Sequence, residues 1–311
     1  MHVAISMIPT WLRPVGAMAL DAVAILAAVI LLFAAMRRWT PRVAAIAHTT
    51  AKEAVSQPLF YVILAIGVFA LVIFPFIPYN TFGEDVKMLK AEGLTLIKLL
   101  AVILALWTSS VSIADEIEGR TALTLLSKPI KRWQLILGKF LGILGPVTLL
   151  FVLLGVVFLG SVCYKVKYDA RETANPEPTA QQYSEEMQQI VPGLVLHFLE
   201  TLVLASISVA ISTRLPMLAN LTICASIYVL GHLVTLIVES PVGRGFEIVR
   251  FMSLFLAAVL PVLEHFSVET AISTGQQVPI SYLAWAGLYA VIYSTVAMLL
   301  ALLLFEDRDL A

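Results

Sequence analysis

Long runs of apolar residues alternate with shorter polar segments along the whole chain. Seven of these runs are about as long as the 20 residues that a helix needs to cross the hydrocarbon core of a bilayer. They are residues 15–36, 58–78, 93–114, 135–160, 193–213, 216–238 and 281–305. A transmembrane β-barrel would instead need many short segments of alternating polarity. The pattern therefore predicts an all-α polytopic membrane protein with about seven transmembrane helices.

The composition agrees with this interpretation and excludes other classes. Of the 311 residues, 60% are hydrophobic and 13% are charged, whereas a soluble domain is typically about half apolar and a quarter charged. A net charge of −1 argues against a nucleic-acid-binding protein, which would be clearly basic. Cys163 and Cys224 lie in different segments without a CxxC motif, so neither a disulfide nor a zinc site is predicted.

A compact polar segment, residues 115–134, separates the third and fourth apolar runs. Its charged residues, together with Lys139 just beyond it, are Asp115, Glu116, Glu118, Arg120, Lys128, Lys131, Arg132 and Lys139. Pro129 pushes the residue before it out of the helical region, and a proline is well tolerated in the first turn of a new helix. The segment is predicted to form a hairpin of helix, short surface helix and helix. A positively charged cytoplasmic loop that only fixes orientation would show the same pattern.

Three motifs follow one another in this region. They are Glu116-Ile117-Glu118-Gly119-Arg120-Thr121, Leu125-Leu126-Ser127-Lys128-Pro129-Ile130-Lys131-Arg132-Trp133 and Leu137-Gly138-Lys139-Phe140. Their order resembles the signature of ABC-2-type permeases of ATP-binding-cassette transporters. More narrowly, it resembles the branch of multi-copper-enzyme maturation permeases. The resemblance implies that residues 115–134 form a cytoplasmic coupling hairpin that a separate ATPase subunit pushes against. Glu116, Glu118 and Arg120 would dock that subunit, and Pro129 and Arg132 would shape or anchor the second helix.

The resemblance covers residues 41–311, which we interpret as the permease domain with a six-helix core. Residues 1–40 would then be an extra N-terminal transmembrane anchor. Within residues 41–57, apolar positions such as Val43, Ala47 and Ala54 recur at helical spacing. This is the place of an amphipathic elbow helix in the family, although an ordinary linker helix would have a similar pattern.

Two polar segments are predicted to form external loops. Residues 161–192 are acidic, and the sequence does not decide whether they order over a channel mouth. Residues 239–280 contain an apolar run, 251–263, that is too short to cross a bilayer. That run is predicted to be re-entrant or interfacial.

Few ionisable residues lie inside the predicted spans. His197 and Glu200 are three positions apart and share a helical face, and His232 lies in the outer half of the next span. Because a charge at the bilayer centre costs about 2.5–3.5 kcal/mol, we expect these side chains to face inward. They could be structural or line a substrate pathway, whereas a metal site would need more ligands. Lys98 is predicted to snorkel to the outer interface.

The distribution of lysine and arginine predicts the orientation. The short cytoplasmic segments of this topology hold 11 of these residues and the longer external segments hold 8. The N-terminus is therefore predicted outside and the C-terminus in the cytoplasm. The family resemblance implies the inner membrane of a bacterium.

The sequence contains no GxxxxGK[ST], HExxH or GxSxG motif, so no catalytic residue, cofactor or metal is predicted for this chain. The leading hypothesis is a permease subunit, working as a homodimer or heterodimer in membrane lipid, with ATP and Mg on a separate ATPase subunit. A non-transporting membrane anchor or assembly factor that recruits a cytoplasmic partner is the alternative. An ion-coupled secondary transporter is disfavoured, because Asp21 and Glu200 both lie toward the outer ends of their predicted spans.

Overall fold

The computed structural model describes residues 12–77, 84–118, 130–173, 176, 178–239, 247–268, 271–272 and 275–306. All regular elements in these ranges are helices, and seven of them are long and apolar enough to cross a membrane. These seven are α2 (Leu12–Trp39), α4 (Pro58–Ile73), α5 (Asp85–Glu118), α7 (Arg132–Glu172), α8 (Ala180–Ser212), α9 (Met217–Glu239) and α13 (Ile280–Glu306). The predicted all-α polytopic fold is confirmed.

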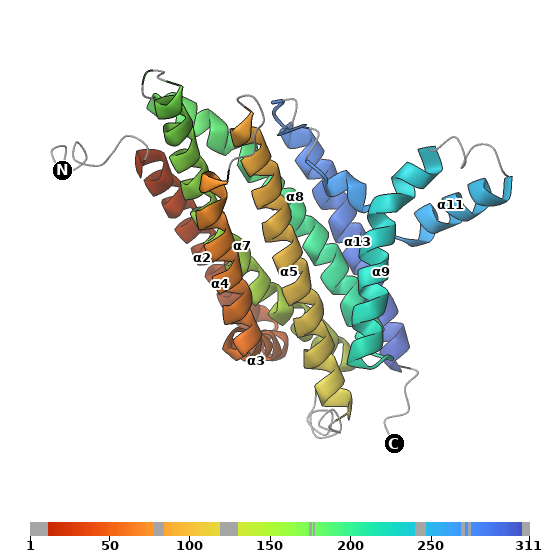
Figure 1. Cartoon of the computed structure of the whole chain (residues 1–311). Helices are drawn as coiled ribbons and strands as arrows, with labels where there is room; N and C mark the ends of the chain where they lie inside the picture. The colour runs from red at the N-terminus through yellow and green to blue at the C-terminus, as the bar shows by residue number, and fades with distance from the viewer. Residues whose placement is uncertain are drawn as a thin grey trace.

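The long helices form one bundle in which successive members run in opposite directions (Figure 1). We call the end where α5 finishes at Glu118 and α7 begins at Arg132 the hairpin end, and the opposite end the far end. The core lies between α5, α7 and α8, of which 72%, 50% and 67% of the spanning windows are buried. The corresponding fraction is only 22% for α9 and zero for α2, so these two helices lie at the periphery.

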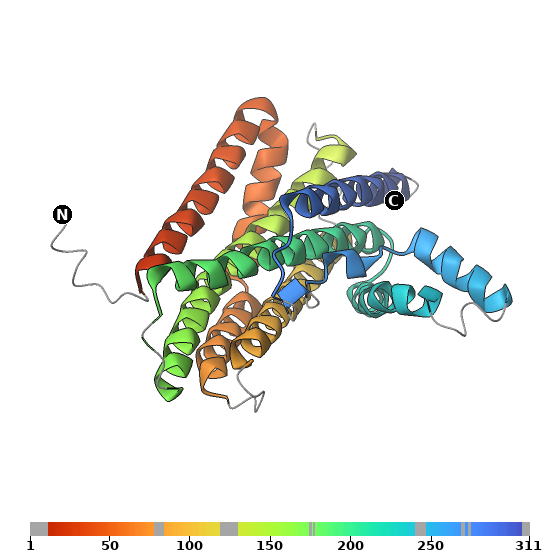
Figure 2. The ribbon, with the colours of Figure 1, turned by 90° about the horizontal axis from the view of Figure 1, so that it is seen from above.

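The predicted elbow is a helix, α3 (Pro41–Ser56), which lies at the hairpin end and packs on α7 (Figures 1 and 2). Glycines of α7 allow this close approach. A Cβ added at Gly142 would lie 2.6 Å from Cβ of Thr50 and 2.8 Å from the carbonyl oxygen of Ala47. Ala47 is itself fully buried in this contact. The elbow is therefore fixed to the first turns of the helix that follows the hairpin.

The structure differs from the predicted loop over residues 161–192. α7 continues to Glu172 and α8 already begins at Ala180, so most of the segment is helical. At the start of α8, the hydroxyl of Thr179 accepts a hydrogen bond from the backbone N–H of Gln182. A count of apolar residues finds only the part of a helix that suits a membrane. Polar residues with high helix propensity can extend the helix well beyond that part. For the same reason, α5 begins eight residues before the predicted span.

The segment after α9 contains the short helices α11 (Glu247–Val259) and η2 (Leu263–Phe266). α11 projects from the bundle beside α9, while η2 returns to pack on α8 and α9 (Figure 1). Thirteen residues are too few to span a bilayer, as predicted for the apolar run here. The segment is held to α13 by tyrosine hydroxyls. Tyr293 donates to the carbonyl of Val259 at 2.9 Å, and Tyr289 accepts from the N–H of Val262 at 3.0 Å.

Candidate functional site

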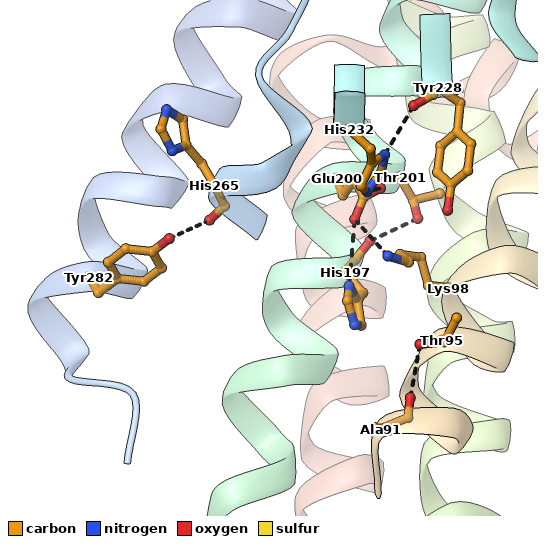
Figure 3. Close-up of polar contacts among 10 residues, drawn as sticks. All are labelled: Ala91, Thr95, Lys98, His197, Glu200, Thr201, Tyr228, His232, His265 and Tyr282. Atoms are coloured by element: carbon orange, nitrogen blue, oxygen red, sulfur yellow. Dashed lines mark hydrogen bonds and ion pairs between the residues drawn. The ribbon is translucent and has the colours of Figure 1, made fainter. Parts of the chain in front are cut away.

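Four ionisable side chains from three helices meet inside the bundle (Figure 3). Glu200 of α8 is at the centre of this group, which we call the Glu200 cluster. Its Oε1 lies 3.3 Å from Nε2 of His232 on α9. Its Oε2 lies 3.5 Å from Nδ1 of His197, one helical turn earlier, and 3.9 Å from Nζ of Lys98 on α5. One carboxylate therefore faces three basic groups.

The cluster is almost completely shielded from solvent. Glu200 has no exposed side-chain surface, and His197 and Lys98 have 1% and 4%. Only His232, with 24% of its side chain exposed, has an edge at the surface of the bundle. An ion pair gains strength in such surroundings, but each charge there also depends on its partner for stability.

This arrangement tests the predictions for the ionisable residues. His197, Glu200 and His232 face inward and come together, as the cost of an intramembrane charge implied. The prediction that Lys98 snorkels is wrong, because its ammonium points to Glu200 instead of the outer interface. Lys98 is thirteen residues into α5, or about 20 Å of helical rise, and its side chain has a carboxylate within reach. The side chains of His197 and Glu200 are almost completely buried and contact other protein side chains in this conformation. A role of these residues in lining the substrate pathway stays a prediction.

A second polar group, centred on Asn220, joins the same three helices nearer the hairpin end. The amide nitrogen of this α9 residue lies 2.6 Å from Oγ of Ser110 on α5, and 2.9 and 2.6 Å from Oγ of Ser208 and Ser212 on α8. An amide has two hydrogens, so at most two of these bonds form at once. Sequence reasoning missed this group. The available signal was an asparagine in one apolar run and serines at helical spacing in two others, a pattern typical of contacts between membrane helices.

We expect Asn220→Ala to lower the free energy of unfolding by about 1–2 kcal/mol, because the serines lose their interhelical donor. Thr222→Val on the same helix is the matched control, since Thr222 is exposed and its hydroxyl donates to the carbonyl of Leu218 within α9. Reversible unfolding in mixed detergent micelles measures both values. Equal stability of the two variants would contradict a role for Asn220 in holding α9.

At the hairpin end, a buried lysine joins α5 to α7. The ammonium of Lys139 donates to the backbone carbonyl of Ser112 at 3.1 Å and to its hydroxyl at 2.9 Å. Lys139 is only 5% exposed, which is rare for a lysine and requires such partners. We call this contact the Lys139 clasp. Ser112 and Lys139 lie just before and just after residues 115–134 in the sequence. The clasp therefore ties together the two helices that flank this segment.

The structure describes only part of the predicted coupling residues. Glu116 and Glu118 lie on the last turn of α5, while Arg120 and Pro129 lie outside the described residues. Arg132 is the first residue of α7, and its Nη1 donates to the carbonyl of Phe305 at the end of α13, at 3.1 Å. Its guanidinium also lies 5.8 Å from the centre of the Phe305 ring. Arg132 thus connects the hairpin end of α7 to the last helix.

Comparison with known families matches this part of the chain. Residues 73–216 match the model of the family described as ABC-2 family transporter protein. This part of the chain is that of an ABC-2-type permease. The matched region begins at the end of α4 and includes α5, the 115–134 segment, α7 and α8, so it contains the Lys139 clasp as well as Lys98, His197 and Glu200. No curated protein matches the permease.

The family assigns the coarse function of the permease. It is the multi-pass membrane component of a transporter and is not itself the ATPase, and permeases of this family in general have an ABC ATPase partner. The match does not distinguish the multi-copper-enzyme maturation branch, which stays a prediction.

Proposed function

We propose that this permease couples ATP hydrolysis on a separate ATPase subunit, which binds ATP and Mg, to translocation of a substrate across the inner membrane of a bacterium. Two permeases, identical or different, would enclose the pathway. The hairpin end and the C-terminus would face the cytoplasm, and the N-terminus would lie outside. The observation that carries the proposal is the Lys139 clasp, which ties α5 to α7 close to the helix ends that flank the 115–134 segment in the sequence.

The clasp gives that segment a way to move helices. If α5 and α7 were joined only by the 115–134 segment, a push on it could bend the connection without tilting either helix. Because the ammonium of Lys139 is buried and bonded to Ser112 of α5, separating the two helices would break both of these charge-assisted hydrogen bonds. The pair therefore responds to a push as one body.

Two further contacts spread the movement. Arg132 connects the start of α7 to the end of α13, and the glycine contact at Gly142 connects α7 to α3. A displacement at the 115–134 segment would thus reach α5, α7, α13 and α3 together. Rigid-body motion of packed helices between two arrangements is the usual form of such transitions.

The alternative, a membrane anchor that only recruits a cytoplasmic partner, requires docking without transmitted motion. It predicts that the partner binds and that substitutions inside the bundle leave the partner's ATPase rate unchanged. Variants that separate binding from stimulation therefore distinguish the two functions.

The direct test is to purify the tagged permease with its ATPase subunit and to measure ATP hydrolysis in nanodiscs. Reversal of charge at Glu118 and Arg120 together, Glu118→Lys with Arg120→Glu, is expected to abolish stimulation while membrane insertion stays intact. Stimulation that is unchanged would remove these residues from the coupling mechanism.

Lys139→Met provides the second arm of that experiment. Methionine fills a similar volume without the charge, so the ATPase subunit should still bind while stimulation falls at least tenfold. Lys87→Met on α5 is the matched control, because Lys87 is partly exposed and its ion pair is with the neighbouring Glu84 of an exposed turn. Full stimulation of the Lys139→Met complex would favour the anchor function.

A further inference from the structure

An apolar pocket lies between the peripheral helix α2 and the core helices α7 and α8. Its volume is about 270 Å³, just below the usual range for pockets that hold drug-sized ligands. Two of its lining side chains, Phe151 of α7 and Phe198 of α8, form an edge-to-face pair with ring centres 5.6 Å apart. The walls from α7 and α8 belong to the matched residues 73–216, whereas the wall from α2 lies outside them.

The lining of the pocket suits a hydrocarbon chain that enters from the bilayer. Apart from Asp21 and Thr148 all lining residues are apolar, and the hydroxyl of Thr148 already donates to the carbonyl of Leu144 at 2.7 Å. Val191 and Val195 of α8 are each 39% exposed. Because both lie in a membrane span, their exposed surface meets hydrocarbon instead of water.

The pocket has the length of one lipid leaflet. On α7 its lining extends from Leu159 back to Thr148, which corresponds to about 16 Å of helical rise. This is about half of the 30 Å hydrocarbon core of a bilayer. In the apolar run 135–160, Thr148 is near the middle and Leu159 is next to the end, so the pocket lies in the half of the span toward the far end.

The one charged residue among the described residues that line the pocket is Asp21. Since α2 begins at the far end, Asp21 lies closer to that end than Ala22 and Ile25, the other lining residues of α2 (Figure 1). Its side chain is exposed, and no described residue pairs with its carboxylate. A charge at the edge of the hydrocarbon needs a partner, and a protonated amine offers an opposite charge and up to three hydrogen bonds.

We propose that this pocket binds a membrane lipid with a primary-amine headgroup, such as phosphatidylethanolamine. One acyl chain fills the pocket toward the middle of the bilayer, and the ammonium group pairs with Asp21. An anionic lipid could place a chain in the same volume, but it would leave the carboxylate without a partner. The bound lipid joins α2 to α7 and α8, which matters because none of the spanning window of α2 is buried in the bundle.

The test uses phosphatidylethanolamine with a photoreactive diazirine at the end of one acyl chain. The full chain is placed in phosphatidylglycerol nanodiscs without an ATPase subunit, and labelled peptides are identified by mass spectrometry. We expect labelling to concentrate around Thr148 and Phe198 and to decrease when unlabelled phosphatidylethanolamine is added. The same diazirine on phosphatidylglycerol should label this region about tenfold less, the effect of one hydrogen bond between charged groups.

Two results of this experiment would overturn the proposal. Equal labelling by the two probes would mean that the pocket holds any lipid chain without regard to the headgroup. Labelling spread evenly over α9 and α13 as well would mean that the probe contacts the bundle only as a surrounding lipid.

Asp21→Asn separates the charge from the shape of the side chain. Asparagine has nearly the same volume but no negative charge, so labelling by the phosphatidylethanolamine probe should fall to the level of the phosphatidylglycerol probe. Asp21→Glu keeps the charge and should retain most of the labelling. A preference for phosphatidylethanolamine that is unchanged in Asp21→Asn would contradict the proposed pairing.

Gly155→Leu tests the position of the acyl chain. Gly155 lines the pocket, and the nearest atom to an added Cβ would be Cδ1 of Leu194 at 3.3 Å, so the rest of a leucine should fill the space of the chain. Gly160→Leu on the same helix is the matched control, because no other atom lies within 4 Å of a Cβ there. Labelling near Thr148 should be lost in the first variant and kept in the second.

Equal labelling of the two leucine variants would place the lipid outside this pocket and overturn the proposal. Since no ATPase subunit is present and no hydrolysis is measured, the result does not depend on the proposed coupling function. The two proposals can therefore fail separately.

Discussion

Replacing Glu200 by leucine will lower the free energy of unfolding by about 3–5 kcal/mol, the usual cost of removing one partner of a buried ion pair. The loss arises because the ammonium of Lys98 stays buried without its carboxylate, 3.9 Å away in the parent. Removing both charges in Lys98→Met with Glu200→Leu should restore most of the stability, since an apolar pair of similar volume does not need a partner. Unfolding in mixed micelles measures all three proteins.

The exposed pair of Lys87 and Glu84 provides the control. Its ammonium and carboxylate lie 2.8 Å apart, closer than in the buried pair, yet Glu84 is 62% exposed. Glu84→Gln should therefore change stability by less than about 1 kcal/mol. If Glu200→Leu costs no more than this control, the cluster does not stabilise the bundle through its charges.

Gly142→Leu is expected to detach α3 from α7, with a cost of about 3 kcal/mol, at the upper end of the range for overpacking. Even one added carbon would lie within 2.8 Å of the backbone of Ala47, and a backbone carbonyl cannot move aside as a side chain can. The leucine should also reduce ATPase stimulation, because the elbow would no longer follow α7. Protease sensitivity of α3 and hydrolysis rates measure the two effects.

Gly160→Leu on the same helix is the control for that change. A Cβ at Gly160 has no other atom within 4 Å, so this substitution should be tolerated. If the two leucine variants have the same stability and rate, then close packing of the elbow on α7 is not required.

The sequence predicted the helices well because membrane thickness imposes the length and polarity of each span. It also predicted that His197, Glu200 and His232 face inward, since the cost of burying a charge leaves few other places for them. It could not identify their partner. Lys98 is more than a hundred residues away in sequence from His232, and its direction depends on how α5 and α8 pack.

Other features depended on contacts that no local pattern encodes. Lys139 was noticed as part of a motif, but its burial against Ser112 follows from the packing of α5 on α7. The tyrosines of α13 had no distinguishing pattern in an apolar run, because their role depends on the return of the chain after α11. The helical ends of residues 161–192 were predicted as a loop because apolar length was the criterion.

The length of α7 has a mechanical consequence. Its 41 residues correspond to about 60 Å, roughly twice the thickness of a hydrocarbon core. A rotation of only about 5° around Arg132 would displace Glu172 by about 5 Å, as follows from that length. Pro146, inside the helix, is the position at which such a lever can flex. The length of α7 would thus amplify a small rotation at the hairpin end into a large displacement at the far end of the bundle.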